Sequence, residues 1–363
     1  MQLPIRPPLR PMLAKRVSEL PAGDGWIFEP KWDGFRVLVF RDGDEWLLQS
    51  RDEKSLNRYF PELIQSLAKA VPPRCVLDGE IVVARAGALD FEALQLRIHP
   101  AASRVALLAR DCPSSIVFWD LLCLDELDLR ASPFHERRTR LEAALAQARP
   151  PVHLTPATTE RPLAEDWFHR FEGPGLDGVM AKASAGFYEP NARVMLKVKH
   201  ERECDCVVAG FRWHKSAASG EIGSLLLGLY DRQGALQHVG VCASFAMPKR
   251  RELLATLTPY RSGALDHHPW SAWAQAAQDT TGSSGHRVPG GKSRWSQGKD
   301  LSWEPLRPEL VAQVAYDHMQ GMRFRHTAQF RRWRTDKAPA ECSYQQLEVT
   351  PPHELTAIFA HVR

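Results

Sequence analysis

The sequence of 363 residues lacks several features that mark special classes of protein. No apolar run approaches the roughly 20 residues that a membrane-spanning helix needs, and no apolar secretion signal follows Met1. The seven cysteines form no C-x-x-C pair, which argues against a zinc ribbon, and their odd number argues against a disulfide framework. We therefore expect a cytoplasmic protein without a membrane partner. We also expect a monomer.

A strong charge of one sign is also absent. The chain has 47 Lys and Arg against 43 Asp and Glu, a formal net charge of +4. Residues 1–200 contain 27 of each sign, so the whole surplus lies in residues 201–363. From Arg287 to Lys337 there are 11 basic and 5 acidic residues. Such a concentration is typical of a polyanion-binding surface, although a solvated basic face is the usual explanation.

Short β-rich segments alternate with scattered helical ones, a pattern that predicts an α+β fold rather than a doubly wound parallel sheet. Apolar runs between turn residues predict strands at 26–29, 35–40, 46–49, 116–122, 178–182 and 194–199. Residues 75–83 are interpreted as two short strands around a tight bend at Asp78-Gly79, and 135–148 as a helix. The length is typical of two domains, with a boundary after Lys199. Runs at 206–211, 223–230 and 236–243 then predict the start of a small β-barrel.

The first candidate for chemistry is the octet from Glu29 to Arg36, E-P-K-W-D-G-F-R. Lys31 is expected on a turn between two strands, where a solvated lysine and a nucleophile are about equally good interpretations. A nucleophilic lysine needs its pKa of about 10.4 lowered by roughly three units, and neighbouring cations, a metal or burial can do this. Asp33 could orient the amine, and Arg36 could bind an anion in bidentate fashion.

Further charged residues stand at strand positions. Residues 78–80 place carboxylates inside an apolar run, and Asp177 precedes another strand. Lys197 and Lys199 share one face of a strand because side chains alternate. Two aligned ammonium groups repel unless an anion lies between them, and a triphosphate would satisfy them.

The segment K-W-D-G-F-R is similar to the K-x-D-G-x-R signature of the covalent nucleotidyltransferases, which include DNA ligases, RNA ligases and capping enzymes. More motifs of that superfamily follow in order: Ser50-Arg51, Asp78-Gly-Glu80, Phe118-Trp-Asp-Leu-Leu122, Asp177-Gly-Val-Met-Ala-Lys182 and Leu196-Lys-Val-Lys199. Residues 290–299 and 323–337 resemble bacterial ATP-dependent DNA ligases of the stand-alone ligase C type. The second of these segments contains the motif VI pattern R-x-D-K as Arg334, Asp336 and Lys337.

This resemblance implies a nucleotidyltransferase adenylation domain of antiparallel sheets and helices with an ATP-grasp-like ligase core, residues 1–200. It also implies a C-terminal OB-fold β-barrel domain, residues 201–363. It implies that Lys31 attacks the α-phosphate of ATP and becomes lysyl-AMP. AMP then passes to the 5′-phosphate of a nick in duplex DNA, and the 3′-hydroxyl seals the strand, in DNA repair near the bacterial nucleoid. An RNA ligase or capping-type enzyme is the alternative. Any polymerase or primase activity would belong to separate partner proteins.

Position by position, the resemblance implies roles in nucleotide binding. Glu29 would read the adenine amino group, and Arg51 and Glu80 would hold the ribose. Trp119 would stack on adenine and should do so at least as well as the commoner Phe. Phe118 is the weaker stacking candidate.

The resemblance also implies roles for several charged residues. Lys197 and Lys199 would contact the α-phosphate, and Arg36 the sugar–phosphate side or the nick 5′-phosphate. Glu80 and Asp177, the latter at a position where the family usually has Glu, would bind Mg²⁺ or Mn²⁺. Motif VI would orient the pyrophosphate leaving group through Arg334, Asp336 and Lys337. A basic loop, residues 278–299, would bind DNA through Arg287, Lys292, Arg294 and Lys299.

Overall fold

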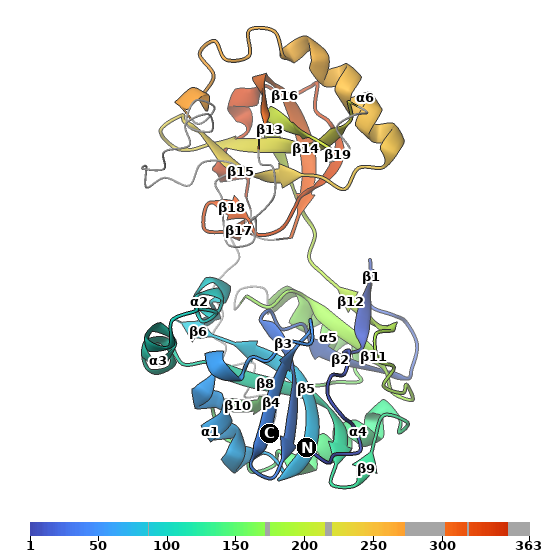
Figure 1. The fold of residues 1–363 in the computed structure, drawn as a ribbon. Coiled ribbons are helices and arrows are strands. Elements are labelled where there is room, and N and C mark those ends of the chain that lie inside the picture. Colours follow the sequence, from blue (N-terminus) through green and yellow to red (C-terminus); the bar gives the residue numbers. More distant parts are fainter. Residues whose placement is uncertain (86, 171–174, 215–219, 273–301, 318, 348–363) are drawn as a thin grey trace. The chain divides into compact units, whose positions relative to one another are not determined.

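The computed structural model describes residues 1–85, 87–170, 175–214, 220–272, 302–317 and 319–347. The chain divides into two compact units, one from Met1 to His200 and one that starts at Glu201 (Figure 1). No helix in these described ranges is long and apolar enough to cross a membrane. The predicted basic loop, residues 278–299, lies outside the described residues.

The N-terminal unit contains two main sheets. The first has the strand order β1 (Leu13–Val17), β12 (Arg193–Val198), β11 (Val179–Ala183) and β2 (Trp26–Pro30). The second has the order β10 (Val152–Leu154), β8 (Ser115–Leu124), β5 (Arg74–Val82), β3 (Phe35–Asp42) and β4 (Glu45–Ser50), with β9 (Leu127–Asp128) on β8. β1 pairs with β12, and β10 with β8, in parallel. Each sheet therefore contains one parallel pair of strands beside its antiparallel pairs, which corrects the prediction that the sheets are antiparallel.

Helices cover the second sheet and complete its core. They are α1 (Pro61–Ala70), α2 (Phe91–Leu96), α3 (Ala102–Asp111) and α4 (Phe134–Ala144), with a 3₁₀ turn η1 (Asn57–Tyr59) and the short hairpin β6 (Ala84–Arg85) and β7 (Ala88–Leu89). α5 (Arg161–Arg170) packs instead on β2 and β11 of the first sheet. α1 buries Leu63 and Leu67 against this core, and Figure 1 shows α1 and α3 on the same side of the unit. The predicted helix at 135–148 is shorter than expected, because α4 ends at Ala144.

The predicted bend at Asp78-Gly79 is wrong, since β5 runs unbroken through both residues. Its register with β3 is regular, and the register with β8 shifts between Asp78 and Gly79. A Cβ atom on Gly79 would lie 2.4 Å from the carbonyl oxygen of Val117. The glycine therefore permits a close approach of two strands rather than a turn.

The C-terminal unit is built on one antiparallel sheet. Its order is β15 (Leu236–Cys242), β14 (Ile222–Tyr230), β13 (Arg202–Trp213), β16 (Glu304–Tyr316) and β19 (Gln329–Trp333). An isolated bridge from Cys242 to Ala328, just before β19, joins the two edges at one point. Among the described residues, this single bridge is the longest connection between the two edges. The sheet is therefore consistent with an OB fold, but it does not form a closed barrel in this part of the chain.

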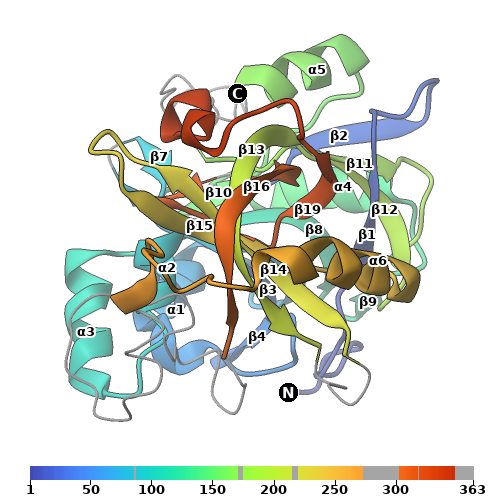
Figure 2. The same ribbon diagram turned by 90° about the horizontal axis from the view of Figure 1, so that it is seen from above.

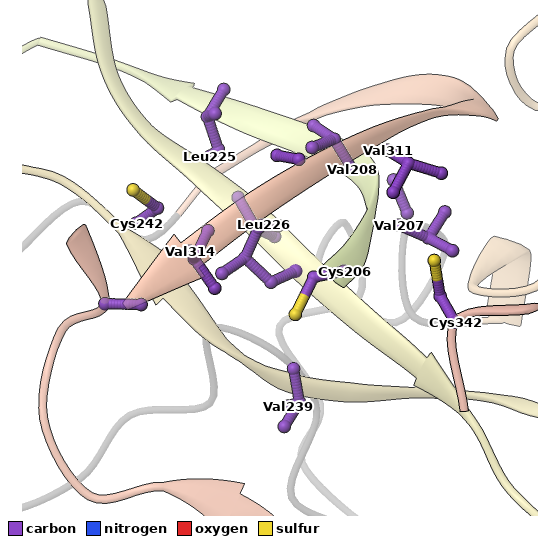
Figure 3. Close-up of a cluster of buried hydrophobic side chains, with 14 of the residues drawn as sticks. Cys206, Val207, Val208, Leu225, Leu226, Val239, Cys242, Val311, Val314 and Cys342 are labelled. Carbon is purple, nitrogen blue, oxygen red and sulfur yellow. The ribbon is translucent and has the colours of Figure 1, made fainter. Parts of the chain in front are cut away.

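Shorter elements surround this sheet. They are α6 (Met247–Leu257), the hairpin β17 (Met319–Gln320) and β18 (Arg323–Phe324), and the 3₁₀ turns η3 (Thr258–Tyr260), η4 (Pro339–Glu341) and η5 (Tyr344–Gln346). Figure 2 shows α6 running alongside β14. Apolar side chains from four of the strands and Cys342 fill the core (Figure 3).

Candidate active site

A cavity of about 210 Å³ opens in the N-terminal unit, lined by strands of both sheets. The structure brings most of the predicted nucleotide-binding residues together on its wall: Glu29, Lys31, Arg36, Arg51, Glu80, Trp119 and Lys197. Segments more than 100 residues apart in the chain therefore meet at one concave site, which is the usual form of a small-molecule site.

Lys31 follows the last residue of β2, and backbone hydrogen bonds fix it to a second motif. Its N–H donates to the carbonyl of Gly178 at 2.9 Å, and the N–H of Asp177 donates to the carbonyl of Lys31 at 2.9 Å. Lys31 Nζ lies 2.8 Å from Asp177 Oδ2, and Lys199 Nζ lies 2.8 Å from the same oxygen. Burial alone would raise the pKa of Asp177, but these two ammonium groups lower it below its usual value.

Lys197 adds a further positive charge to the wall. Burial first, and then Lys31 and Lys199, lower the pKa of Lys197 below its ordinary value. Asp177 opposes this shift, and Arg51 adds to it. An incoming phosphate would relieve the mutual repulsion of these cations.

Glu29 is 2 % exposed on β2 and is held by two cations. Lys182 Nζ lies 2.6 Å from its Oε2, and Arg138 Nη1 lies 3.2 Å from its Oε1. Arg138 also donates to the carbonyl of Thr155 at 2.7 Å. The sequence analysis assigned no role to Arg138, because a charged residue on a helix gives no signal of a distant partner. Lys182, in contrast, belongs to one of the recognised motifs.

Trp119 and Phe118 are neighbours on β8 and face opposite sides. Phe118 is fully buried in the core of the second sheet, whereas Trp119 lines the cavity. The guanidinium carbon of Arg36 lies 4.9 Å and Lys182 Nζ 5.5 Å from the Trp119 ring centroid. Of the two predicted stacking candidates, only Trp119 faces the cavity.

Arg36 is held by a carboxylate inside the protein. Its Nε and Nη2 donate to the two oxygens of Asp78 at 2.7 and 2.6 Å, and Tyr188 donates its hydroxyl to Asp78 at 2.8 Å. Burial would lower the pKa of Arg36, but Asp78 raises it above its ordinary value. The bidentate edge of Arg36 therefore binds Asp78, which leaves the remaining edge for a phosphate or sugar.

Glu80 is the carboxylate on the wall best suited to a divalent cation. It accepts a hydrogen bond from the Gly34 N–H at 3.0 Å and, among the described residues, forms no ion pair. Burial raises the pKa of Glu80 to about 7 although Lys31 and Arg36 oppose the shift. The described part of the chain contains no group of three or more His, Cys, Asp or Glu that could hold a metal. A metal here would therefore need phosphate oxygens or water as further ligands.

The motif VI residues lie in the C-terminal unit. Two of them bind Asp205, a residue to which the sequence analysis assigned no role. Arg334 Nη1 and Lys337 Nζ are each 2.8 Å from Oδ2 of Asp205 on β13. Arg334 also binds both oxygens of Asp336 at 2.9 Å. The predicted DNA-binding cations of the basic loop lie outside the described residues: Arg287, Lys292, Arg294 and Lys299.

Comparison with known proteins agrees with this arrangement. Residues 11–199 match a family model described as ATP dependent DNA ligase domain, and residues 218–337 match one described as ATP dependent DNA ligase C terminal region. The chain belongs to the ATP-dependent DNA ligases. It is similar to DNA ligase C2 of Mycolicibacterium smegmatis, with 55% identity over 353 residues that cover 97% of this chain and 98% of the relative.

Other DNA ligases extend the likeness. DNA ligase C of Mycobacterium tuberculosis is 52% identical over 354 residues, which are 96% of each chain. These relatives place the chain with the stand-alone ligase C type. A solved Lig E DNA ligase matches with a TM-score of 0.56 at 15% identity, covering 89% of this chain and 99% of that one. That structure supports the nucleotidyltransferase fold followed by an OB-like unit.

Proposed function

We propose that this ATP-dependent DNA ligase seals nicks in duplex DNA in three steps. The Lys31 amine attacks the α-phosphorus of ATP, a P–N bond forms, and pyrophosphate leaves. The 5′-phosphate of the nick then displaces Lys31 from AMP, which restores the free amine. Finally the 3′-hydroxyl attacks the activated 5′-phosphate, AMP leaves, and the phosphodiester is closed. Each step is an in-line transfer that depends on positioning and charge neutralisation.

The observation that carries this proposal is the position of Lys31 on a cavity wall that carries an excess of cations. Asp177 holds its ammonium group, and Lys197, Lys199 and Arg51 surround the same region. Asp177 fixes the position of the Lys31 side chain, and the proton that the amine must lose before it attacks passes to solvent. The remaining cations can bind the α-phosphate and stabilise charge in the transition state.

Adenine recognition is assigned to Glu29 and Trp119. A carboxylate held by Arg138 and Lys182 accepts but does not donate hydrogen bonds, which suits the exocyclic amino group of adenine rather than the guanine oxygen. Trp119 offers its ring to the cavity for stacking. These contacts favour a DNA ligase that uses ATP over a GTP-using capping enzyme.

Mg²⁺ or Mn²⁺ would be held by Glu80 and triphosphate oxygens, and Arg51 and Glu80, which both line the cavity, would hold the ribose. When bound, such a cation neutralises phosphate charge. Asp177 stays a second candidate ligand, but in this structure its carboxylate binds two lysines. Glu80 is therefore the stronger candidate.

Nicked duplex DNA is the proposed partner, bound through Arg36 and the basic loop cations Arg287, Lys292, Arg294 and Lys299. A monomer that acts in repair beside separate polymerase or primase proteins, in the bacterial cytoplasm, completes the proposal. The uneven charge of the chain supports a polyanionic partner, because the whole basic surplus lies beyond residue 200.

Labelled nucleotide tests the proposal directly. The wild-type protein should form an adduct with ATP labelled in the α-phosphate that is labile in acid and stable in alkali, as a P–N bond is, release pyrophosphate, and form no adduct with GTP. Lys31→Ala should remove the adduct and nick sealing. Lys249→Ala, a change to a half-exposed lysine of α6, should retain both activities. A lysyl-GMP adduct, or sealing with ATP by Lys31→Ala, would contradict the proposed chemistry.

A further inference from the structure

Asp205 holds an unusually fixed position in the C-terminal unit. Side chains alternate along β13, so Cys204 and Cys206 enter the core while Asp205 faces the other side, where it is nevertheless only 7 % exposed. β14 pairs with β13 only from Val207 onward. Gln346 fills the missing ladder position: its side-chain amide accepts from the Asp205 N–H at 2.8 Å and donates to the Asp205 carbonyl at 2.9 Å. The backbone that carries this carboxylate is therefore held in place.

The two motif VI cations are brought to this fixed point. The N–H of Arg334 donates to the carbonyl of Val311 on β16, the neighbour of β13, at 2.8 Å. The guanidinium of Arg334 and the ammonium of Lys337 then meet on the same oxygen of Asp205. Their side chains are 19% and 20% exposed, so each is largely covered while part of it still faces solvent.

A contribution to stability does not by itself explain why a carboxylate occupies position 205. Oδ1 of Asp205 is buried and has no hydrogen-bond partner among the described residues. A buried carboxylate oxygen without a partner is unfavourable, and an apolar residue is often a better choice for stability. What the carboxylate does provide is one anchor shared by Arg334 and Lys337. The hydrogen bond to Asp205 also raises the pKa of Lys337 above its ordinary value.

We propose that Asp205 is the positioning residue of motif VI, and that it sets the direction in which Arg334 and Lys337 meet the pyrophosphate leaving group. The inference rests on the proposed function, in which these cations act in the first step. Asp205 itself touches no reacting atom. Only lysine adenylation expels pyrophosphate, so a loss of Asp205 should slow that step and spare the closure of a nick that already carries AMP.

Asp205→Asn tests this, because it keeps the shape of the side chain and removes its charge. Single-turnover formation of lysyl-AMP is measured over a range of ATP concentrations, and sealing of a pre-adenylated nicked duplex is measured with the same preparations. We expect the limiting rate of adenylation to fall on the order of 10- to 100-fold, as for a misplaced catalytic group. The KM for ATP should change by less than about threefold, because the loss concerns the transition state. Sealing of the pre-adenylated nick should match the wild type.

Glu221→Gln is the matched control. Glu221 is a carboxylate of the same unit, 1 % exposed, with one oxygen 3.2 Å from Arg251 and the other buried without a partner in the described structure. It contacts no motif VI residue, so adenylation should remain near the wild-type rate.

The possible results separate the explanations. Unchanged adenylation in Asp205→Asn would overturn the inference, and so would an equal fall in both steps, which indicates a structural role. An equal effect of Glu221→Gln would overturn it as well. If the wild-type protein forms no lysyl-AMP at all, the proposed function itself fails and the inference fails with it.

Discussion

Asp177 in the N-terminal unit and Asp205 in the C-terminal unit each bring two cationic side chains to a single carboxylate oxygen, and all four distances are 2.8 Å. Their surroundings differ. The cations on Asp177 lie among further positive groups, Lys197 and Arg51, at a cavity. Around Asp205 a second acid, Asp336, balances the charge of the cluster.

The difference shows that one ion-pair geometry can serve two purposes. At Asp177 positive charge is in excess, so an anionic phosphate can enter and take over the cations. At Asp205 charge is balanced and the backbone is held by Gln346, so the carboxylate acts as a permanent anchor. We therefore expect changes at Asp177 to affect every step that handles AMP, and changes at Asp205 to affect only the first.

The largest effect is expected for Asp177→Asn. Loss of this charge leaves Lys31 without its bonded carboxylate, and we expect lysine adenylation to fall on the order of 100-fold or more. Sealing of a pre-adenylated nick should also slow, unlike in Asp205→Asn. Single-turnover assays of both steps on both variants provide the measurement. An Asp177→Asn defect confined to adenylation would remove the distinction between the two aspartates.

The salt dependence of DNA binding and of lysine adenylation should also distinguish the two units. DNA affinity should fall on the order of 10- to 100-fold between 50 and 200 mM salt if several phosphates are contacted. Lysine adenylation should fall only a few-fold, because its charges lie in a partly enclosed cavity that salt screens weakly. Binding of nicked duplex and adduct formation are measured over the same salt series. Equal salt dependence would argue against the division of charge between the units.

A smaller effect is expected at Arg138. Arg138→Met removes one of the two cations on Glu29, and we expect the KM for ATP to rise about 10-fold because the adenine contact loses its orientation. Arg138→Lys should recover part of this loss. Arg140→Met, on the exposed face of the same helix, is the control. Single-turnover formation of the lysyl-nucleotide adduct over a range of ATP and GTP concentrations is the measurement, and an unchanged KM in Arg138→Met would remove Arg138 from recognition.

The smallest effect concerns stability at Glu80. Burial raises the pKa of Glu80 from 4.5 to about 7, so ionising it in the folded protein is unfavourable, and stability is lost as pH rises through this interval. Glu80→Gln should therefore increase the free energy of unfolding by on the order of 2 kcal/mol at pH 8 and have little effect near pH 4. Urea unfolding at the two pH values is the measurement. A variant less stable than the wild type at pH 8 would contradict this pKa shift.

Much of the fold and the motif-bearing part of the site could be predicted from the sequence. Apolar runs between turn residues predicted strands that the structure contains, including β3, β8 and β15. The motifs around Lys31, Glu80 and Lys197 could be expected to meet because family resemblance supplied their order, and the cavity does bring them together.

The remaining features depend on contacts that local patterns do not encode. Arg138 reaches Glu29 across 109 positions, and Lys337 reaches Asp205 across 132. Gly79 was misread as a bend because a glycine that permits a close strand approach looks the same in sequence as one that permits a turn. Only the folded backbone distinguishes these cases.

Gln346 has a consequence for any shortened version of this ligase. The family model for the C-terminal region ends at Lys337, the last residue of motif VI. A fragment cut there would keep every recognised motif but lose Cys342, which is fully buried in the core, and the amide of Gln346. Such a fragment would contain Arg334 and Lys337 without the support that fixes their anchor. The working boundary of this unit therefore lies beyond the boundary that motif recognition suggests.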